Sequence, residues 1–199
     1  MLSAKRPITA GESKHSMRLF IAVNLNDDMK DALIDVQDTM RTYGVHGKDT
    51  PPENMHLTLA FIGEYDDPEL VKEVVESIEV RPFKIRLSGI GAFGDLWWVG
   101  LENSAPLMAV SRRLRRALAE AGIPFDKKKF SPHITMIRRA SGRLSEEAKE
   151  EMNAHLKPNA AAGGQAAAHE CGCAASMTVD HISLMRSDRG KYGMIYTEL

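Results

Sequence analysis

Residues 52–61 read Pro-Glu-Asn-Met-His-Leu-Thr-Leu-Ala-Phe, and residues 130–138 read Phe-Ser-Pro-His-Ile-Thr-Met-Ile-Arg. Both stretches contain the order His, aliphatic, Thr, aliphatic, which begins at His56 and again at His133, 133 minus 56 or 77 residues later. Residues i and i+2 of a β-strand point to the same side. Each stretch is therefore predicted to be a strand that turns its His and Thr to one surface and its aliphatic residues to a core.

Chance does not account well for the repeated motif. Seven His and eight Thr among 199 residues give an expectation of about 0.3 His-x-Thr triplets, before aliphatic flanks are required. A single triplet is better explained as a polar strand face whose His bonds to a neighbouring carbonyl group. Two copies in matched settings favour a shared site, with His56, Thr58, His133 and Thr135 as its candidate residues.

Two imidazoles that face one another across a cleft suit phosphate chemistry near neutral pH. A neutral imidazole acts as a base, a protonated one acts as an acid, and such a pair needs no metal. The hydroxyl groups of Thr58 and Thr135 can donate hydrogen bonds to phosphate oxygens, and Arg138 can add a charge-assisted contact. Strict alternation would turn Arg138 away from His133, so this role predicts a β-bulge or a strand end nearby.

The patterns around the two stretches predict an α+β protein. Residues 18–24 form a buried strand, and Asn26 caps a covering helix whose apolar stripe runs from Met29 to Tyr43. Asp67 and Pro68 begin a second helix. Further strands are expected at 56–62, 83–88, 96–101, 133–138, 177–186 and 192–199, and further helices at 106–121 and 144–156. Antiparallel strands and helices thus occur in both halves of the chain.

Length and composition fit an ordinary globular protein, with 43% apolar residues in 199. One bilobal domain is expected over residues 17–199, preceded by a disordered leader over residues 1–16 and interrupted by a low-complexity Ala/Gly insert over residues 158–175. No apolar stretch is long enough to span a membrane. The two cysteines are separated by one residue and suggest no disulfide framework. A monomeric, cytoplasmic protein is predicted.

Positive charge is concentrated in residues 112–143, which carry ten basic side chains against Glu120 and Asp126. This excess favours a polyanionic partner. A solvated helix face followed by a lysine loop explains the charge alone at least as well. The basic stretch supports a polyanionic partner only in combination with the motif beside it.

Two weaker signals concern aromatic residues and metals. Trp98 and Phe130 are candidates for stacking on a base, although core packing is the commoner role of such side chains. Residues 169–173 read His-Glu-Cys-Gly-Cys. This segment lacks the paired spacing of a zinc site, so neither a metal nor a cofactor is predicted.

The paired motifs, the Arg five residues after the second His, and the Met-Arg-Leu-Phe-Ile-Ala of residues 17–22 resemble the two-histidine (2H) phosphoesterases. Within them the chain is similar to the bacterial and archaeal RNA 2',3'-cyclic phosphodiesterases, also labelled 2'-5' RNA ligases. The similarity runs over residues 17–199 and includes the Leu-Met-Arg-Ser of residues 184–187. It implies a bilobal fold in which two pseudo-symmetric antiparallel sheets, backed by helices, enclose a central cleft.

The resemblance also implies roles for the candidate residues. His56 would be the general acid that protonates a leaving 3'-oxygen, and His133 the general base that activates water, which leaves a 2'-phosphate. Thr58, Thr135 and Arg138 would hold the phosphate. The expected substrates are RNA with 2',3'-cyclic phosphate ends or cyclic nucleotides. Two alternatives stay open: 2'-5' linkage chemistry, as a 2'-5' RNA ligase or 2'-5' oligonucleotide phosphodiesterase, and non-catalytic binding of RNA or nucleotides.

Overall fold

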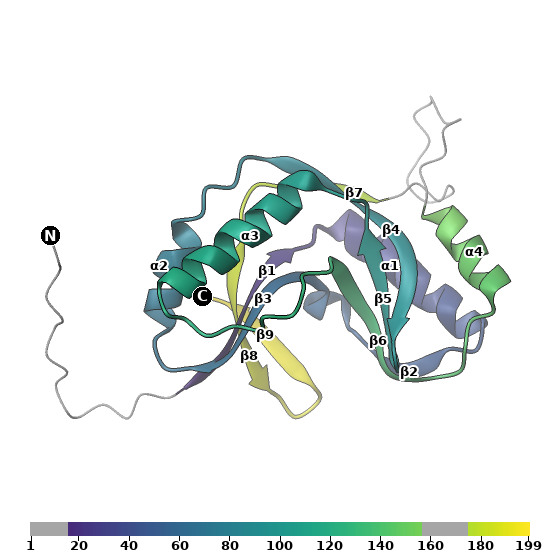
Figure 1. Cartoon of the computed structure of the whole chain (residues 1–199). Helices are drawn as coiled ribbons and strands as arrows, with labels where there is room; N and C mark the ends of the chain where they lie inside the picture. Colours follow the sequence, from purple (N-terminus) through teal and green to yellow (C-terminus); the bar gives the residue numbers. More distant parts are fainter. Residues whose placement is uncertain (1–15, 157–174) are drawn as a thin grey trace, which may run out of the picture.

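The computed structural model describes residues 16–156 and 175–199, in which helices back a curved sheet (Figure 1). The strands are β1 (Met17–Asn24), β2 (His46–Asp49), β3 (His56–Tyr65), β4 (Phe83–Phe93), β5 (Leu96–Leu101), β6 (His133–Ser141), β7 (Ser176–Val179), β8 (Ser183–Arg189) and β9 (Met194–Glu198). The helices are α1 (Asp27–Thr42), η1 (Pro52–Asn54), α2 (Pro68–Glu76), α3 (Ala105–Glu120) and α4 (Glu146–His155). The predicted α+β class is confirmed, whereas the leader and the Ala/Gly insert fall almost entirely outside the described residues.

The strands of the described residues follow the order β7-β4-β5-β6-β3-β1-β8-β9, with β2 paired to β6. All strand pairs are antiparallel. The order has two halves, and each half ends in one of the predicted His-x-Thr strands. These strands, β3 and β6, pair at Leu57 and Ile134. The two predicted sheets are therefore joined at this pair, and the two motifs meet in the middle of the molecule.

The helices back both halves, and two of them, α1 and α3, contact the half opposite to the strand that each follows in the chain. Helix α2 packs against β1 and β8, and α4 packs against β4. Helix α1 follows β1 in the chain but contacts β2, β6 and β7 of the opposite half. The predicted helix starts are confirmed, because the Asn26 and Asp67 side chains accept hydrogen bonds from the backbone of Met29 and Leu70. Helix α3 follows β5 but contacts β3 and α2 of the other half, so α1 and α3 both connect the two halves.

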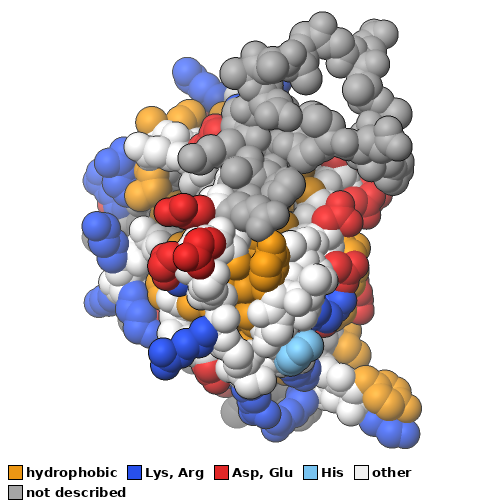
Figure 2. All heavy atoms as spheres, turned by 90° about the vertical axis from the view of Figure 1, so that its right-hand side faces the viewer, with side chains coloured by type: hydrophobic (Ala, Val, Ile, Leu, Met, Phe, Trp, Pro, Cys, Tyr) orange, Lys and Arg blue, Asp and Glu red, His pale blue; other side chains and the backbone are white. Residues whose placement is uncertain are grey.

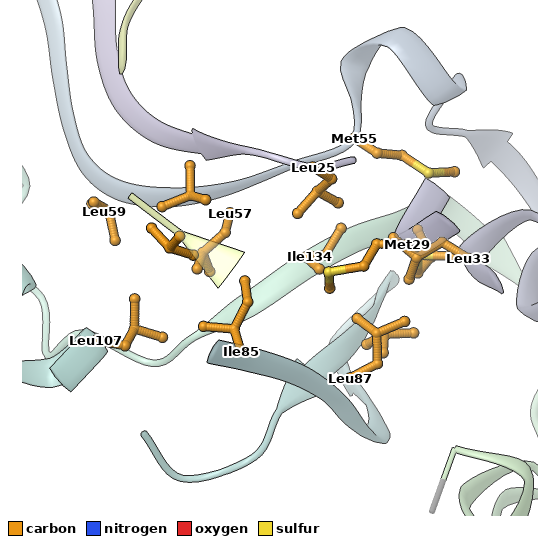
Figure 3. Packing of buried hydrophobic residues seen from close by; sticks show 14 of the residues in the cluster. Leu25, Met29, Leu33, Met55, Leu57, Leu59, Ile85, Leu87, Leu107 and Ile134 are labelled. Atoms are coloured by element: carbon orange, nitrogen blue, oxygen red, sulfur yellow. The ribbon is translucent and has the colours of Figure 1, made fainter. Parts of the chain in front are cut away.

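The apolar residues of the two motifs lie at the centre of the core. Leu57 and Ile134 are completely buried, and Figure 3 shows them among Leu25, Leu59 and Ile85. Buried residues from both halves form one continuous cluster. Burial of a Leu or Ile side chain contributes about 1.5–3 kcal/mol. This burial fixes the strands in position and leaves their His and Thr side chains on the opposite face.

The prediction of a single strand over residues 177–186 is wrong, because the chain forms two strands there. Strand β7 pairs with β4 in one half, and β8 pairs with β1 in the other half. Residues 180–182 carry the chain across. The apolar residues Val179 and Ile182 continue through the break, so the sequence pattern gives no sign of it. Strand β2 was not expected either, since His-Gly-Lys-Asp lacks apolar alternation.

Candidate active site

A cleft of about 520 Å³ lies where β3 and β6 meet, and its walls include all five candidate residues, His56, Thr58, His133, Thr135 and Arg138. Because the strands are antiparallel, the pairing of Leu57 with Ile134 places His56 across from Thr135 and Thr58 across from His133. An approximate two-fold axis through this pair relates the motifs. The cleft can thus surround one small anion with a histidine and a threonine from each half.

The backbone orients both imidazoles in the same way. Nδ1 of His56 donates to the carbonyl oxygen of Asn54 at 2.8 Å, and Nδ1 of His133 donates to that of Ser131 at 2.7 Å. A carbonyl oxygen only accepts, so Nδ1 carries hydrogen and Nε2 is the nitrogen that gains or loses a proton. Nε2 of His56 lies 2.9 Å from Oγ1 of Thr58. The proton-exchanging atom of His56 is therefore beside a hydroxyl group of the cleft.

Burial lowers the pKa of His56 below its ordinary value of 6.5. Desolvation is the largest cause, the hydrogen bond to Asn54 opposes it, and the positive charges of Arg138 and His133 add to it. His56 is therefore mostly neutral at pH 7 in the protein alone. An anion bound in the cleft would offset these positive charges and favour the protonated imidazole.

A β-bulge in β6 turns Arg138 into the cleft. Consecutive residues Trp97 and Trp98 of β5 pair with Ile137 and Thr135 of β6, so β6 contains one extra residue between them. The extra residue and Ile137 are both buried, so two consecutive side chains point to the core. The side chain of Arg138 therefore points to the opposite face. The predicted bulge is confirmed, and Arg138 shares the face of Thr135.

Strand β3 carries a matching irregularity after its own motif. Ile21 of β1 pairs with Ala60, but the next residue, Ala22, pairs with Thr58. Leu59 and Ala60 are consequently both buried, and the side chain of Phe61 emerges on the cleft side. Phe61 follows His56 by five residues, as Arg138 follows His133. The two halves therefore present Phe and Arg at equivalent positions.

Aromatic side chains pack against both histidines, and two of them, Phe20 and Tyr196, were not among the predicted site residues. The ring of His56 lies 4.8 Å from Phe20 and 5.2 Å from Tyr196, measured between centroids. His133 lies 5.3 Å from Phe93 on the other side. Phe20 and Tyr196 belong to β1 and β9, which only the strand order brings to β3. No local sequence signal could have identified them.

The two residues predicted to stack on a base lie outside the walls of the cleft. The Trp98 ring is 6.2 Å from His133 and packs over Gly91, where an added Cβ would come within 2.8 Å of three indole carbons. Phe130 packs against the core and lines a different pocket. Base stacking by either residue stays a prediction. The aromatic residues in the walls of the cleft itself are Tyr192 and Tyr196.

Most of the basic stretch lies outside the walls of the cleft, and two of its arginines bond to backbone carbonyl groups. Arg113 donates to the carbonyl oxygen of Glu79, and Arg115 donates to those of Asp126 and Lys128. Of the ten basic residues in 112–143, only Arg138 belongs to the walls of the cleft. On the face shown in Figure 2, Lys and Arg side chains gather along the left edge and the bottom. The other basic side chains in the walls of the cleft, Lys48 and Lys191, come from elsewhere in the chain.

The described residues contain no group of three or more His, Cys, Asp or Glu placed to hold a metal ion. His169, Cys171 and Cys173 lie outside the described residues. In the same part of the chain, no helix is both long and apolar enough to cross a membrane.

Comparison with known proteins identifies relatives along most of the chain. A family model of the 2'-5' RNA ligase superfamily matches residues 32–191. The RNA 2',3'-cyclic phosphodiesterase of Methanothermobacter thermautotrophicus is 28% identical over 194 residues, which cover 92% of this chain and 96% of that protein. The protein of the same name from Thermotoga maritima is 34% identical over 132 residues, which cover 61% of this chain and 70% of that protein.

Solved structures share the fold. A Thermus thermophilus protein, TT0787, superposes with a TM-score of 0.68 at 26% identity, and the match covers 92% of this chain and 95% of that one. E. coli LigT in its apo form gives a TM-score of 0.69 at 22% identity, with 93% and 95% covered. The family match and these folds agree with the paired motifs at the cleft, and they establish that the chain belongs to the 2'-5' RNA ligase superfamily, the 2H phosphoesterases.

Proposed function

We propose that this protein hydrolyses the 2',3'-cyclic phosphate at the end of an RNA strand and leaves a 2'-phosphate and a 3'-hydroxyl group. The observation that carries the proposal is the single cleft that contains a His-x-Thr pair from each half of the sheet, together with Arg138. The names of the relatives, RNA 2',3'-cyclic phosphodiesterases, support the same reaction. Cyclic mononucleotides are expected to be substrates as well.

In the proposed complex, the phosphate lies between the two imidazoles. The hydroxyl groups of Thr58 and Thr135 donate to its non-bridging oxygens, and the guanidinium of Arg138 adds a charge-assisted contact. Negative charge on these oxygens grows as a fifth oxygen bonds to phosphorus. Donors fixed in place by buried strands stabilise that charge without reorganisation, so they lower the barrier more than they tighten binding of the substrate.

The chemical step moves two protons in opposite directions. Nε2 of His133 takes a proton from water as the water oxygen bonds to phosphorus opposite the 3'-oxygen. The bond from phosphorus to the 3'-oxygen breaks, and that oxygen receives the proton of Nε2 of His56. One water is consumed, and the product is a 2'-phosphomonoester. His133 then loses its proton to solvent, and His56 regains a proton from solvent as the next substrate binds.

The lowered pKa of His56 has a consequence for its role as acid. His56 must carry a proton when the phosphate is bound, although burial disfavours that form in the protein alone. In the proposed complex the phosphate lies beside His56, Arg138 and His133. Its negative charge offsets the repulsion that the positive charges of Arg138 and His133 exert on the imidazolium of His56. Substrate binding and protonation of His56 are therefore coupled.

The family name supports 2'-5' linkage chemistry as a second candidate. If the 5'-hydroxyl group of another RNA strand replaces water, the same residues form a 2'-5' phosphodiester and release the 3'-hydroxyl group. Addition of an oligoribonucleotide with a free 5'-hydroxyl group tests this reaction. Rates of joining and of hydrolysis, measured under the same conditions, show which of the two predominates.

The direct test uses an oligoribonucleotide that ends in a 2',3'-cyclic phosphate, incubated with the protein in excess chelator. We expect complete conversion to the 2'-phosphate isomer, because side chains of the cleft supply every step. A 3'-phosphate product would overturn the choice of the 3'-oxygen as leaving group. Salt-sensitive binding without turnover would instead support the non-catalytic alternative.

A further inference from the structure

A second groove, of about 1010 Å³, adjoins the active-site cleft. The two share His56, Thr58, Arg138, Met194 and Tyr196 in their walls. From these residues the second groove extends along β1, β3 and the hairpin of β8 and β9, all in the half of the sheet that carries His56. His133 and Thr135 are not part of its walls. An RNA strand whose end is bound at the cleft could therefore continue into the second groove past His56 but not past His133.

Positive charge predominates in the second groove. Four arginines, Arg18, Arg138, Arg186 and Arg189, stand against the carboxylates of Glu64 and Asp188. Arg186 is held by Asp188, whose Oδ2 lies 2.7 Å from its Nε. Arg18 and Arg189 are exposed. These four residues come from β1, β6 and β8, and only Arg138 belongs to the basic stretch that the sequence made conspicuous.

The groove also contains an exposed aromatic ring with a cation above it. The guanidinium carbon of Arg18 lies 4.9 Å from the centroid of Phe61, and Phe61 keeps 36% of its surface exposed. Aromatic rings and guanidinium planes are the surfaces on which unpaired bases stack, and neighbouring cations contact the phosphates of the strand. Arg18 and Phe61 provide both kinds of contact at one place.

The direction of the reaction decides which part of the substrate enters this groove. Attack on phosphorus is in line, so the leaving 3'-oxygen lies opposite the attacking water, on the side of His56. The terminal ribose carries that oxygen, and the rest of the RNA is attached through the 5'-carbon of the same ribose. The RNA therefore leaves the cleft on the side where the second groove begins.

We propose that the arginine groove, formed by Arg18, Phe61, Arg186 and Arg189, binds the nucleotides that precede the cyclic phosphate in single-stranded RNA. This inference rests on the proposed hydrolysis at the cleft and adds a preference for oligonucleotides over mononucleotides. Contacts to phosphates and base faces are common to all sequences, so the preference depends on length and not on base identity.

The first experiment compares kcat/KM for a 2',3'-cyclic mononucleotide with kcat/KM for oligoribonucleotides of two, four and eight residues that carry the same terminal base. For the unmodified protein we expect the longer substrates to be favoured by roughly tenfold or more, with similar gains for A and U tracts. In the Arg18→Ala/Arg189→Ala variant the ratio of oligonucleotide to mononucleotide should fall toward one. A ratio near one in the unmodified protein, or one that survives both substitutions, would overturn the proposal.

The matched control is Arg112→Ala/Arg116→Ala, which removes the same charge from the exposed face of α3, outside both grooves. Its length preference should equal that of the unmodified protein. An equal loss in this control would mean that the net charge of the molecule, and not the groove, attracts RNA.

A binding measurement separates failure of this inference from failure of the proposed function. A fluorescein-labelled octaribonucleotide with a 2'-phosphate end is titrated by anisotropy at several salt concentrations. Each phosphate contact on a single strand contributes about 0.7 to the slope of log K against log salt, so the loss of two contacts should flatten the slope by about 1.4. An unchanged slope in Arg18→Ala/Arg189→Ala refutes the groove even if the protein is an active enzyme. A flattened slope supports it even if no hydrolysis is found.

Discussion

His56 and His133 are oriented in the same way because each donates Nδ1–H to the carbonyl oxygen of the residue two positions earlier. The sequence predicted these two residues and their threonines, since a strand period of two and a repeated triplet are local signals. It could not predict the different surroundings of the two rings. Phe20 and Tyr196, which pack on His56, lie on strands whose neighbours are set by the whole sheet.

The pKa of His56 offers a test of the electrostatics at this residue. Burial and the charge of Arg138 both lower that pKa, so the Cε1 proton resonance of His56 should titrate with a midpoint below 6.5. Arg138→Gln removes a positive charge that disfavours the imidazolium, and the midpoint should rise. Inorganic phosphate should raise it in the unmodified protein. Arg139→Gln, the adjacent exposed residue, serves as the control, and an equal rise there would contradict the assignment to Arg138.

Replacement of either histidine tests the proposed acid and base. His56→Ala and His133→Ala should each lower kcat by about 10²–10⁴-fold, because proton transfer in the transition state contributes that much. His181→Ala is the control, since His181 is exposed and bonds to Asp180 at the surface. Rates are measured with a 2',3'-cyclic mononucleotide, with folding checked by circular dichroism. Full activity of either cleft variant would remove that residue from the mechanism.

The strands show where sequence periodicity succeeds and where it fails. Simple alternation placed His56, Thr58, His133 and Thr135 on one face, and the need to bring Arg138 to the same face predicted a bulge that the β5–β6 register contains. The same reasoning fused β7 and β8 into one strand. Apolar residues on both sides of residues 180–182 fit one buried strand equally well, and only pairing with β4 or β1 separates them.

The close packing of β4 and β5 beside His133 should make kcat sensitive to a substitution at Gly91. In Gly91→Ala, the new Cβ would come within 2.8 Å of three indole carbons of Trp98, the residue directly opposite. The indole must move, and with it Phe93, which packs on both Trp98 and His133. Small displacements of a catalytic group are costly, so kcat should fall by roughly tenfold or more.

Gly122→Ala is the control for this substitution. Gly122 ends α3 with φ at +73° and has open space around it, so the variant loses stability through backbone strain of about 1 kcal/mol without a change at the cleft. Both variants are assayed well below their melting temperatures. Equal activity of Gly91→Ala and Gly122→Ala would show that Trp98 does not position His133.

At the scale of the molecule, the two halves of the sheet depend on each other. The resemblance predicted two lobes with one motif each. It did not predict that α1 would pack on the half opposite to its own strand, or that one apolar cluster would extend through both halves. Such features follow from contacts between residues far apart in the chain, which periodicity does not report. The cleft therefore exists only when both halves are folded and joined at Leu57 and Ile134.

We accordingly expect the protein to unfold in one cooperative transition. The two tryptophans, Trp97 and Trp98, both lie on β5, so their fluorescence reports only the half that carries His133. Circular dichroism in the far ultraviolet reports the helices and strands of both halves. Because the shared core must be opened to unfold either half, urea titrations followed by the two signals should have the same midpoint and slope.

A second reporter extends this test to the half that carries His56. Tyr65 lies at the end of β3 and packs against the core, so Tyr65→Trp in a Trp97→Phe/Trp98→Phe background moves the fluorescent probe across the molecule. Its transition should coincide with that of circular dichroism measured on the same variant. If the two halves unfold at different urea concentrations, the His56 and His133 strands fold independently. The joint at Leu57 and Ile134 would then hold two separate units in contact, and the cleft would be lost when the less stable unit unfolds.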